Sequence, residues 1–191
     1  MEERMDYKSM YEAILEEHRQ VFEALDQESM RAFIETIKNY DRIYCIGVGR
    51  EGMMTRALAM RLMHMGKEVH WIWDDTTPFI GEGDLLIATL GDGCIGHIDY
   101  VCRRAKESGA YICVVTGSPS GRTAQEVADQ IFFIPASVYR GTDKVVPSFQ
   151  PMGNLFEQCL LNVFDIVVMT LVDEIEGLTF EKMSHRHRNI E

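Results

Sequence analysis

Two near-continuous apolar runs restrict this chain to one broad class of fold. DLLIATL covers residues 84–90, and AYICVVT covers residues 110–116. A strand that is apolar on both faces must be buried on both faces, which is typical of a parallel sheet with helices packed on each side. Each run ends in a loop of small residues and is followed by a helical pattern. The runs therefore predict an α/β protein with ligand-binding loops at the carboxyl ends of its strands.

Shorter apolar segments extend this alternation of strands and helices along the chain. The expected strands are residues 43–46, 68–73, 84–90, 110–116 and 130–135. The expected helices are residues 7–25, 28–38, a segment from about Met53 to Gly66, 97–107, a short helix with Ala124, Val127 and Ala128, 151–175 and 179–187. Asp26 is the expected N-cap of the second helix, and residues 136–150 form a long loop. This order predicts a single doubly wound domain over residues 1–191.

A glycine-rich turn lies between the first strand and its helix, in IYCIGVGREGMM. Gly47, Gly49 and Gly52 have the spacing G-x-G-x-x-G. Glycines let the backbone approach a ligand closely, and the N–H groups at the start of a helix favour an anion. A dinucleotide site also needs an acid after the second strand, which Asp74 or Asp75 could supply. The spacing alone leaves open a dinucleotide or another anionic ligand.

Charge and composition argue against several classes of function. The formal net charge of −11 argues against a nucleic-acid-binding surface. The charged N-terminal segment lacks the apolar core of a signal peptide, and we expect no apolar run long enough to span a bilayer. The five cysteines have no metal-ligand spacing; Cys45, Cys113 and Cys159 lie in apolar runs and fit buried thiols, and a reducing compartment fits best. The chain is therefore expected to be cytoplasmic, with neither a membrane contact nor a metal site.

Five motifs together resemble the sugar isomerase (SIS) family. They are IGVGREG, AMRLMHMG, VTGSPSG, QPMGNLFEQ and the C-terminal HRHRNIE. Within that family they are most similar to the 6-phospho-3-hexuloisomerase branch. The resemblance implies a flavodoxin-like, five-stranded parallel sheet with extra N- and C-terminal helices. It also implies a homo-oligomer, dimer or tetramer, with shared active sites and no cofactor, and a glycine turn that holds an anionic sugar in place of a dinucleotide.

The activity that the resemblance implies is migration of a carbonyl along an anionic six-carbon sugar through an enediol. Glu157 matches the acid in P-x-G-x-x-F-E and is implied to be the proton-transferring base. His187 matches the histidine in H-x-N-x-E and is implied to serve the sugar oxygens or ring, from the same or another subunit. Without the resemblance, Glu157 is equally explained as a helix-start acid and His187 as a solvated tail residue.

Substrate binding is implied for three loops at the strand ends. The candidate residues are Gly47, Gly49, Arg50, Glu51, Gly91, Asp92, Gly93, Thr116, Ser118 and Ser120. The chain departs from the family pattern in two places. Glu51 stands where the first turn, G-x-G-x-S-G, has serine, and the second loop, usually S-G-S-G-E-T, has lost its hydroxyls at Leu90, Asp92 and Ile95. An ionised Asp92 repels a phosphate dianion unless a cation compensates. The candidate cations are Arg50, Arg122, Arg140 and Lys144.

The altered second loop leaves several interpretations open. A phosphosugar is accommodated if basic residues compensate or if the third loop holds the anion. A sugar bearing a singly charged sulfonate is an alternative, and a non-catalytic domain that senses sugar phosphates is another. Asp92 either contacts ligand or only caps the next helix. Glu157 and His187 both match the family motifs, and we expect no DNA-binding segment in the chain. Both points favour an enzyme over a sensing domain.

Overall fold

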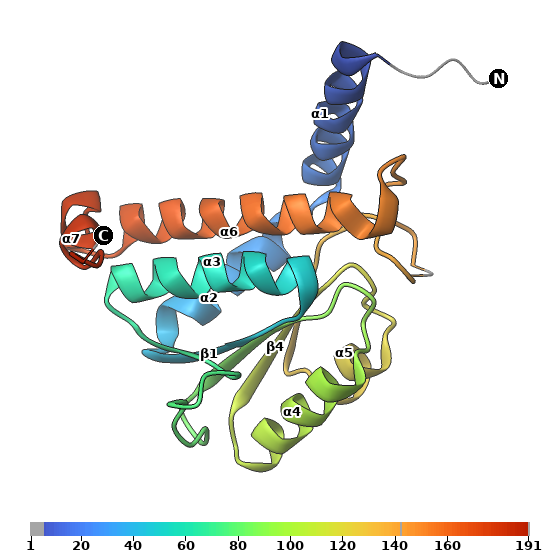
Figure 1. The fold of residues 1–191 in the computed structure, drawn as a ribbon. Coiled ribbons are helices and arrows are strands. Elements are labelled where there is room, and N and C mark those ends of the chain that lie inside the picture. Colours follow the sequence, from blue (N-terminus) through green and yellow to red (C-terminus); the bar gives the residue numbers. More distant parts are fainter. Residues whose placement is uncertain (1–5, 142, 191) are drawn as a thin grey trace.

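The computed structural model describes residues 6–141 and 143–190, and Figure 1 shows their arrangement. Five parallel strands form one sheet in the order β2-β1-β3-β4-β5. The strands are β1 (Arg42–Ile46), β2 (Glu68–Trp71), β3 (Leu85–Thr89), β4 (Tyr111–Thr116) and β5 (Gln130–Phe133). The helices are α1 (Tyr7–Ala24), α2 (Gln27–Asn39), α3 (Gly49–Met65), α4 (Gly96–Glu107), α5 (Arg122–Glu126), α6 (Asn154–Glu174) and α7 (Phe180–His185), with a 3-10 turn, η1 (Pro151–Gly153), before α6. The doubly wound parallel architecture expected from the sequence is confirmed.

Alternate residues of the strands point into two separate apolar cores. Ile43 and Cys45 pack in the core that contains α2, α3 and α6, whereas Tyr44 and Ile46 pack in the core that contains α4 and α5. This alternation is the two-residue period of a strand. All five residues of β3 are buried, as its continuous apolar run requires. The sheet is therefore the middle of three layers (Figure 1).

Local backbone chemistry sets the ends of several elements. Asp26 caps α2 as expected, because its carboxylate accepts a hydrogen bond from the Ser29 N–H at 2.8 Å. The expected strand 68–73 is too long: β2 ends at Trp71, whose carbonyl accepts a turn hydrogen bond from the Asp74 N–H at 2.9 Å. The helix α3 begins at Gly49, within the glycine motif. Arg50 and Glu51 therefore lie in the first turn of that helix.

The helix α6 is the centre of the larger core. Ten of its residues are buried, including Phe156 and Phe164. Together, η1 and α6 form a helical segment, Pro151–Glu174, that is long and apolar enough by length and composition to cross a bilayer, so the expectation that no segment reaches this length is wrong. More than half of its apolar window, 56%, is buried inside the protein. That burial is typical of the core helix of a globular domain.

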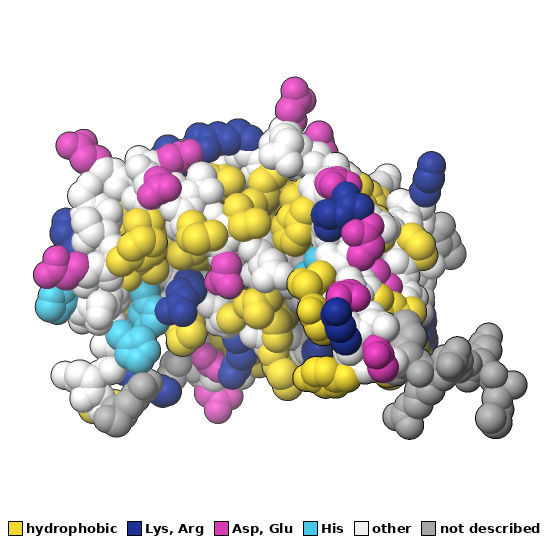
Figure 2. All heavy atoms as spheres, turned by 90° about the horizontal axis from the view of Figure 1, so that it is seen from above, with side chains coloured by type: hydrophobic (Ala, Val, Ile, Leu, Met, Phe, Trp, Pro, Cys, Tyr) yellow, Lys and Arg dark blue, Asp and Glu magenta, His cyan; other side chains and the backbone are white. Residues whose placement is uncertain are grey.

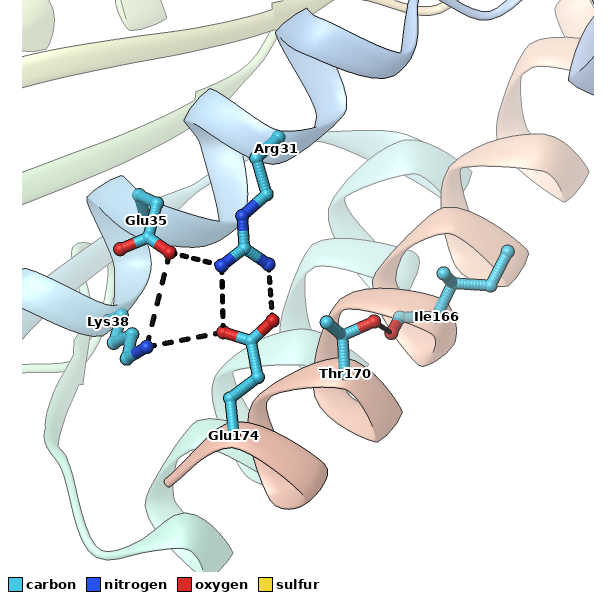
Figure 3. Close-up of polar contacts among 6 residues, drawn as sticks. All are labelled: Arg31, Glu35, Lys38, Ile166, Thr170 and Glu174. Carbon is cyan, nitrogen blue, oxygen red and sulfur yellow. Dashed lines mark hydrogen bonds and ion pairs between the residues drawn. The ribbon is translucent and has the colours of Figure 1, made fainter. Parts of the chain in front are cut away.

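Ion pairs fix the C-terminal end of α6 against α2 (Figure 3). The Glu174 carboxylate accepts hydrogen bonds from the Arg31 guanidinium and lies 3.2 Å from Lys38 Nζ. Glu35 joins the same cluster through Arg31. Partly exposed pairs of this kind contribute about 0–1 kcal/mol each, so their main effect is on geometry. They hold the point from which the chain turns into α7, whose Met183 is buried in the larger core.

The turn between β1 and α3 depends on close packing of glycines. A Cβ on Gly52 would lie 2.8 Å from the carbonyl carbon and oxygen of Gly47, and a Cβ on Gly47 would lie 2.3 Å from Thr89 Oγ1. Beneath the turn, the Thr55 and Thr89 hydroxyls are hydrogen-bonded at 2.8 Å. These contacts bring the start of α3 against the end of β3.

We expect Gly52→Ala to lower the free energy of unfolding by about 1–3 kcal/mol, because the added methyl group meets backbone atoms that cannot move aside. Gly96→Ala is the matched control, since a Cβ at the start of α4 meets nothing within 4 Å. Urea denaturation of both variants measures the difference. Equal stability of the two variants would show that the glycine packing is not required.

Candidate active site

A small pocket of about 140 Å³ lies beside the carboxyl ends of β1 and β3 and the first turn of α6. Its lining residues are Val48, Gly49, Arg50, Glu51, Gly91, Asp92, Ile95, Val138, Tyr139, Met152, Gly153, Phe156 and Glu157. Doubly wound sheets bind their ligands at this edge. Three separate elements supply a carboxylate to the lining: α3 supplies Glu51, the loop after β3 supplies Asp92, and α6 supplies Glu157.

Glu157 lies in the first turn of α6, with its side chain only 16% exposed. Arg50 Nη1 lies 2.9 Å from Glu157 Oε2, and the same guanidinium is hydrogen-bonded to the Asn154 side chain. Among the described residues, no donor is aligned to hydrogen-bond Oε2, so Arg50 acts on it as a nearby charge. Burial raises the pKa of Glu157, and Arg50 opposes this rise. A carboxylate in such surroundings is suited to accept a proton from a bound ligand.

Glu51 crosses from α3 to the loop after β3. Its Oε2 accepts a hydrogen bond from the Gly91 N–H at 2.8 Å. Burial raises the pKa of Glu51 to about 8, and repulsion from Asp92 and Glu157 adds to the rise while the Gly91 N–H opposes it. Glu51 is therefore mostly protonated at neutral pH, in contrast to an exposed glutamate.

Asp92 holds the long loop after β5. Its Oδ1 accepts a hydrogen bond from the Arg140 N–H at 3.1 Å. The interpretation of Asp92 as a helix cap is wrong, because the N-cap of α4 is Ile95 and α4 has no side-chain cap. Val138 and Tyr139 of the same loop line the pocket. Asp92 thus anchors part of the pocket wall.

An internal carboxylate occupies the third loop. Asp143 Oδ2 accepts hydrogen bonds from the hydroxyls of Ser118 at 2.5 Å and Ser120 at 2.8 Å. These bonds, that of Ser118 above all, lower the pKa of Asp143. Thr116 is fully buried, and its hydroxyl donates to the Leu90 carbonyl at 2.6 Å. The two serines can therefore receive a ligand anion only if Asp143 leaves, and Thr116 has a structural position.

Six of the candidate residues from the sequence are brought together in the pocket: Gly49, Arg50, Glu51, Gly91, Asp92 and Glu157. Gly47 and Gly93 lie behind the lining, where they pack against neighbouring backbone and side chains. Sequence reasoning missed the walls contributed by Val138, Tyr139, Met152, Gly153 and Phe156. Two features of the sequence could have indicated these lining residues: the long loop 136–150 and the PMGNLFE motif. Met152 has φ of 58°, a left-handed conformation that is costly for a residue with a side chain and that is found disproportionately at functional sites.

His187 follows α7, a helix that lies at the far end of α6 from the first turn with Glu157 (Figure 1). Its ring centroid is 5.2 Å from that of His64 in the last turn of α3, whereas Glu51 is in the first turn of the same helix. These two turns are roughly 20 Å apart at 1.5 Å per residue. His187 borders a second cavity of about 630 Å³, together with Met169 and Phe180. Within one chain, His187 and Glu157 therefore cannot contact the same small ligand.

Neither of the acids that follow β2, Asp74 and Asp75, lines the pocket. Asp74 is paired with Arg56 at 3.1 Å, outside the pocket lining. Within residues 6–141 and 143–190, no three His, Cys, Asp or Glu side chains form a metal-binding group.

Comparison with known proteins extends over most of the chain. No family model matches it. The 3-hexulose-6-phosphate isomerase of Bacillus subtilis is 33% identical over 167 residues, 87% of this chain and 89% of that protein. The enzyme of the same name from Mycobacterium gastri is 36% identical over 167 residues, 87% of this chain and 82% of that protein. A solved structure from Methanococcus jannaschii, described as inferring the function of a 3-hexulose-6-phosphate isomerase, has a TM-score of 0.81 at 25% identity and covers 95% of this chain and 99% of its own. The chain therefore belongs to the 3-hexulose-6-phosphate isomerases, within the sugar isomerase (SIS) proteins that its motifs indicated.

Proposed function

We propose that this chain is a cytosolic isomerase that moves the carbonyl of an anionic six-carbon sugar between adjacent carbons, with 3-hexulose 6-phosphate as the model substrate. The observation that supports it best is the buried Glu157 beside Arg50 in a pocket at the strand ends. No metal or other cofactor takes part in the proposed step. The Glu157 carboxylate takes a proton from the carbon next to the carbonyl, an enediol forms, and the proton returns to the neighbouring carbon.

Glu157→Gln should keep the shape of this side chain but remove its ability to accept a proton. Turnover of 3-hexulose 6-phosphate should fall by roughly 10²–10⁴-fold, the usual contribution of a positioned base, while binding persists. Glu174→Gln is the matched control, because it makes the same change at the other end of α6, in the ion-pair cluster with Arg31 and Lys38. Steady-state kinetics measure both variants. Wild-type turnover by Glu157→Gln would exclude Glu157 as the base.

We infer that a second copy of the chain completes each active site. The α1 helix projects from the body (Figure 1) and exposes Tyr7 and Leu15, at 89% and 60%. Hydrophobic side chains also gather on the helical face seen in Figure 2, and exposed Met60, Met63 and Met169 belong to the helices α3 and α6. Apolar surface of this kind favours association. Within one chain, His187 lies too far from Glu157 to share a small ligand. A neighbouring chain could bring its own His187 close to Glu157.

Mixing two inactive variants tests the shared site. We expect Glu157→Gln and His187→Asn to be impaired separately, and activity to reappear when the two are mixed, dissociated and reassembled. A mixed oligomer then contains some sites with an intact Glu157 from one chain and an intact His187 from another. The readout is turnover before and after reassembly. Reassembled oligomers with no gain in activity would contradict a site shared in this way.

We propose that the anionic group of the substrate binds at the third loop after residues 138–141 and Asp143 move. The pocket, at about 140 Å³, is smaller than the roughly 300–1,000 Å³ usual for ligand sites. Two carboxylates tie this segment down, Asp92 through the Arg140 N–H and Asp143 through Ser118 and Ser120. Of the candidate cations, Arg50 is paired with Glu157 and Arg122 with Asp99. Arg140 and Lys144 flank Asp143 and are exposed, so they can meet an incoming anion.

Asp143→Asn should therefore tighten the binding of inorganic phosphate by about tenfold, or ~1.4 kcal/mol, because the anion displaces a neutral amide in place of a carboxylate. Asp74→Asn removes the same charge at the surface and serves as the control. Titration calorimetry measures both dissociation constants. Equal affinities in the two variants would mean that the anion binds elsewhere.

A sulfonate-bearing sugar is the second candidate substrate, and Asp92 in the pocket lining favours it, because a carboxylate repels a singly charged sulfonate less than a phosphate dianion. The Gly91 N–H is already used by Glu51, so the second loop offers little to a phosphate dianion. Thermal-shift measurements with sugar phosphates and sulfosugars separate the two. Ligands that bind without being turned over would instead indicate a sensing domain.

A further inference from the structure

Glu51 is an acidic residue of the pocket at a position where the SIS motif has serine. Its Oε2 is anchored on the Gly91 N–H at 2.8 Å, and a Cβ on Gly91 would lie 2.9 Å from that oxygen. The same Cβ would lie 3.3 Å from the Phe156 ring, so glycine at position 91 leaves room for both. The Gly91 N–H thus holds the carboxyl group at the wall of a pocket that Phe156 also lines.

The second oxygen of Glu51 is available to a ligand. Hydrogen bonds from the described residues reach Oε2 and leave Oε1 without a partner. The charged groups that face the carboxyl group are Asp92 from the loop after β3, Glu157 from α6, and Arg50 from the same turn of α3. Arg50 is engaged by Glu157. The surroundings of Glu51 therefore favour its neutral form, which can donate a hydrogen bond from Oε1.

We propose that Glu51 is a catalytic acid of the isomerisation, donating its proton to the carbonyl oxygen of the sugar while Glu157 removes the proton from the adjacent carbon. This inference rests on the proposed function, because it requires enediol formation at Glu157. Glu51 and Glu157 line the same pocket, and the charge of Glu157 acts on Glu51, so a sugar bound there can meet both side chains.

Atoms and electrons balance over the two half-reactions. The Glu157 carboxylate takes the proton from carbon, the C–H electron pair becomes the double bond of the enediol, and the carbonyl oxygen takes the proton of Glu51. The Glu51 carboxylate is then stabilised by the Gly91 N–H. In the second half, the neighbouring hydroxyl gives its proton to Glu51 as the new carbonyl forms, and Glu157 returns its proton to the former carbonyl carbon. Both carboxyl groups regain their starting states.

The different surroundings of the two glutamates assign the roles of acid and base. Arg50 lies 2.9 Å from Glu157 and favours its ionised form, whereas the charges that act on Glu51 are those of two other acids, Asp92 and Glu157. Burial raises the pKa of Glu51 to about 8, so the acid keeps its proton at neutral pH. Pairs of carboxyl groups that differ in this way commonly divide acid and base catalysis.

The test is the pH dependence of kcat/KM for 3-hexulose 6-phosphate in wild type, Glu51→Gln and Asp92→Asn. Wild-type kcat/KM should fall as the pH rises through about 8, because Glu51 loses its proton. Glu51→Gln still accepts from the Gly91 N–H but transfers no proton, so its kcat should fall by roughly 10²–10⁴-fold and its alkaline decline should vanish. Asp92→Asn neutralises the neighbouring acid, which should move the decline to lower pH without removing it.

A thermal melt as a function of pH provides a readout that does not depend on turnover. Because the native state keeps the Glu51 proton up to about pH 8 and the unfolded state loses it near 4.5, wild-type stability should fall between these values. The melting temperature of Glu51→Gln relative to wild type should therefore rise from pH 5 to pH 9. Glu51→Ser, with the serine of the SIS motif, replaces Glu51→Gln in the kinetics if the latter does not fold.

Near-wild-type turnover by Glu51→Gln, or an alkaline decline that persists in it, would overturn the assignment of Glu51. If Glu157→Gln is inactive in the same assay, the proposed function survives that result. Absence of wild-type turnover would overturn both proposals, since the role of Glu51 depends on the reaction.

Discussion

Burial of two carboxyl groups at one end of the sheet is the constraint on which the candidate site depends. Glu51 and Glu157 enter the pocket from the first turns of α3 and α6, where few water molecules can solvate them. Removal from water raises both pKa values, and different neighbours then separate the two groups. Arg50 places a positive charge beside Glu157 and so opposes the rise in its pKa. At Glu51, a single backbone N–H, that of Gly91, opposes the rise in pKa that burial causes. The proposed division of acid and base follows from these contacts.

The fold keeps the two groups together through packing distant from the pocket. Gly47 and Gly52 set the angle at which α3 leaves β1, because neither has space for a Cβ. The apolar core fixes α6 along its length, and the Glu174 cluster fixes its far end against α2. In contrast, the loop 136–150 is tied down at Asp92 and Asp143 by a few polar contacts. The two groups proposed to be catalytic thus lie on helices packed in the core, whereas part of the pocket wall lies on a segment with weaker attachments.

The sequence was sufficient to predict the sheet, since the buried strands carry continuous apolar runs that allow few alternatives. It also placed Arg50, Glu51 and Asp92 near one another, because the loops at parallel strand ends must meet, whereas Glu157 was a candidate only through the resemblance of its motif. It could not predict that carboxylates of the protein itself accept hydrogen bonds from donors expected to bind the ligand. Glu51 does so at the Gly91 N–H, and such contacts depend on loop conformation. The sequence also could not predict the distance between His187 and Glu157, because tertiary packing sets the position of a short terminal helix. One length was underestimated: the helical segment Pro151–Glu174 is long and apolar enough to cross a bilayer, although its burial shows that this apolarity serves the core.

The account requires proton transfer through Glu157, and isomerisation in deuterium oxide tests this most directly. Because a protonated Glu157 exchanges with solvent, product from the wild-type protein should carry deuterium at the carbon that receives the proton, as detected by NMR or mass spectrometry. Substrate recovered during the reaction should carry deuterium at the carbon beside its carbonyl. Complete conversion without deuterium in either molecule would indicate direct hydrogen transfer between the carbons and would contradict the enediol mechanism.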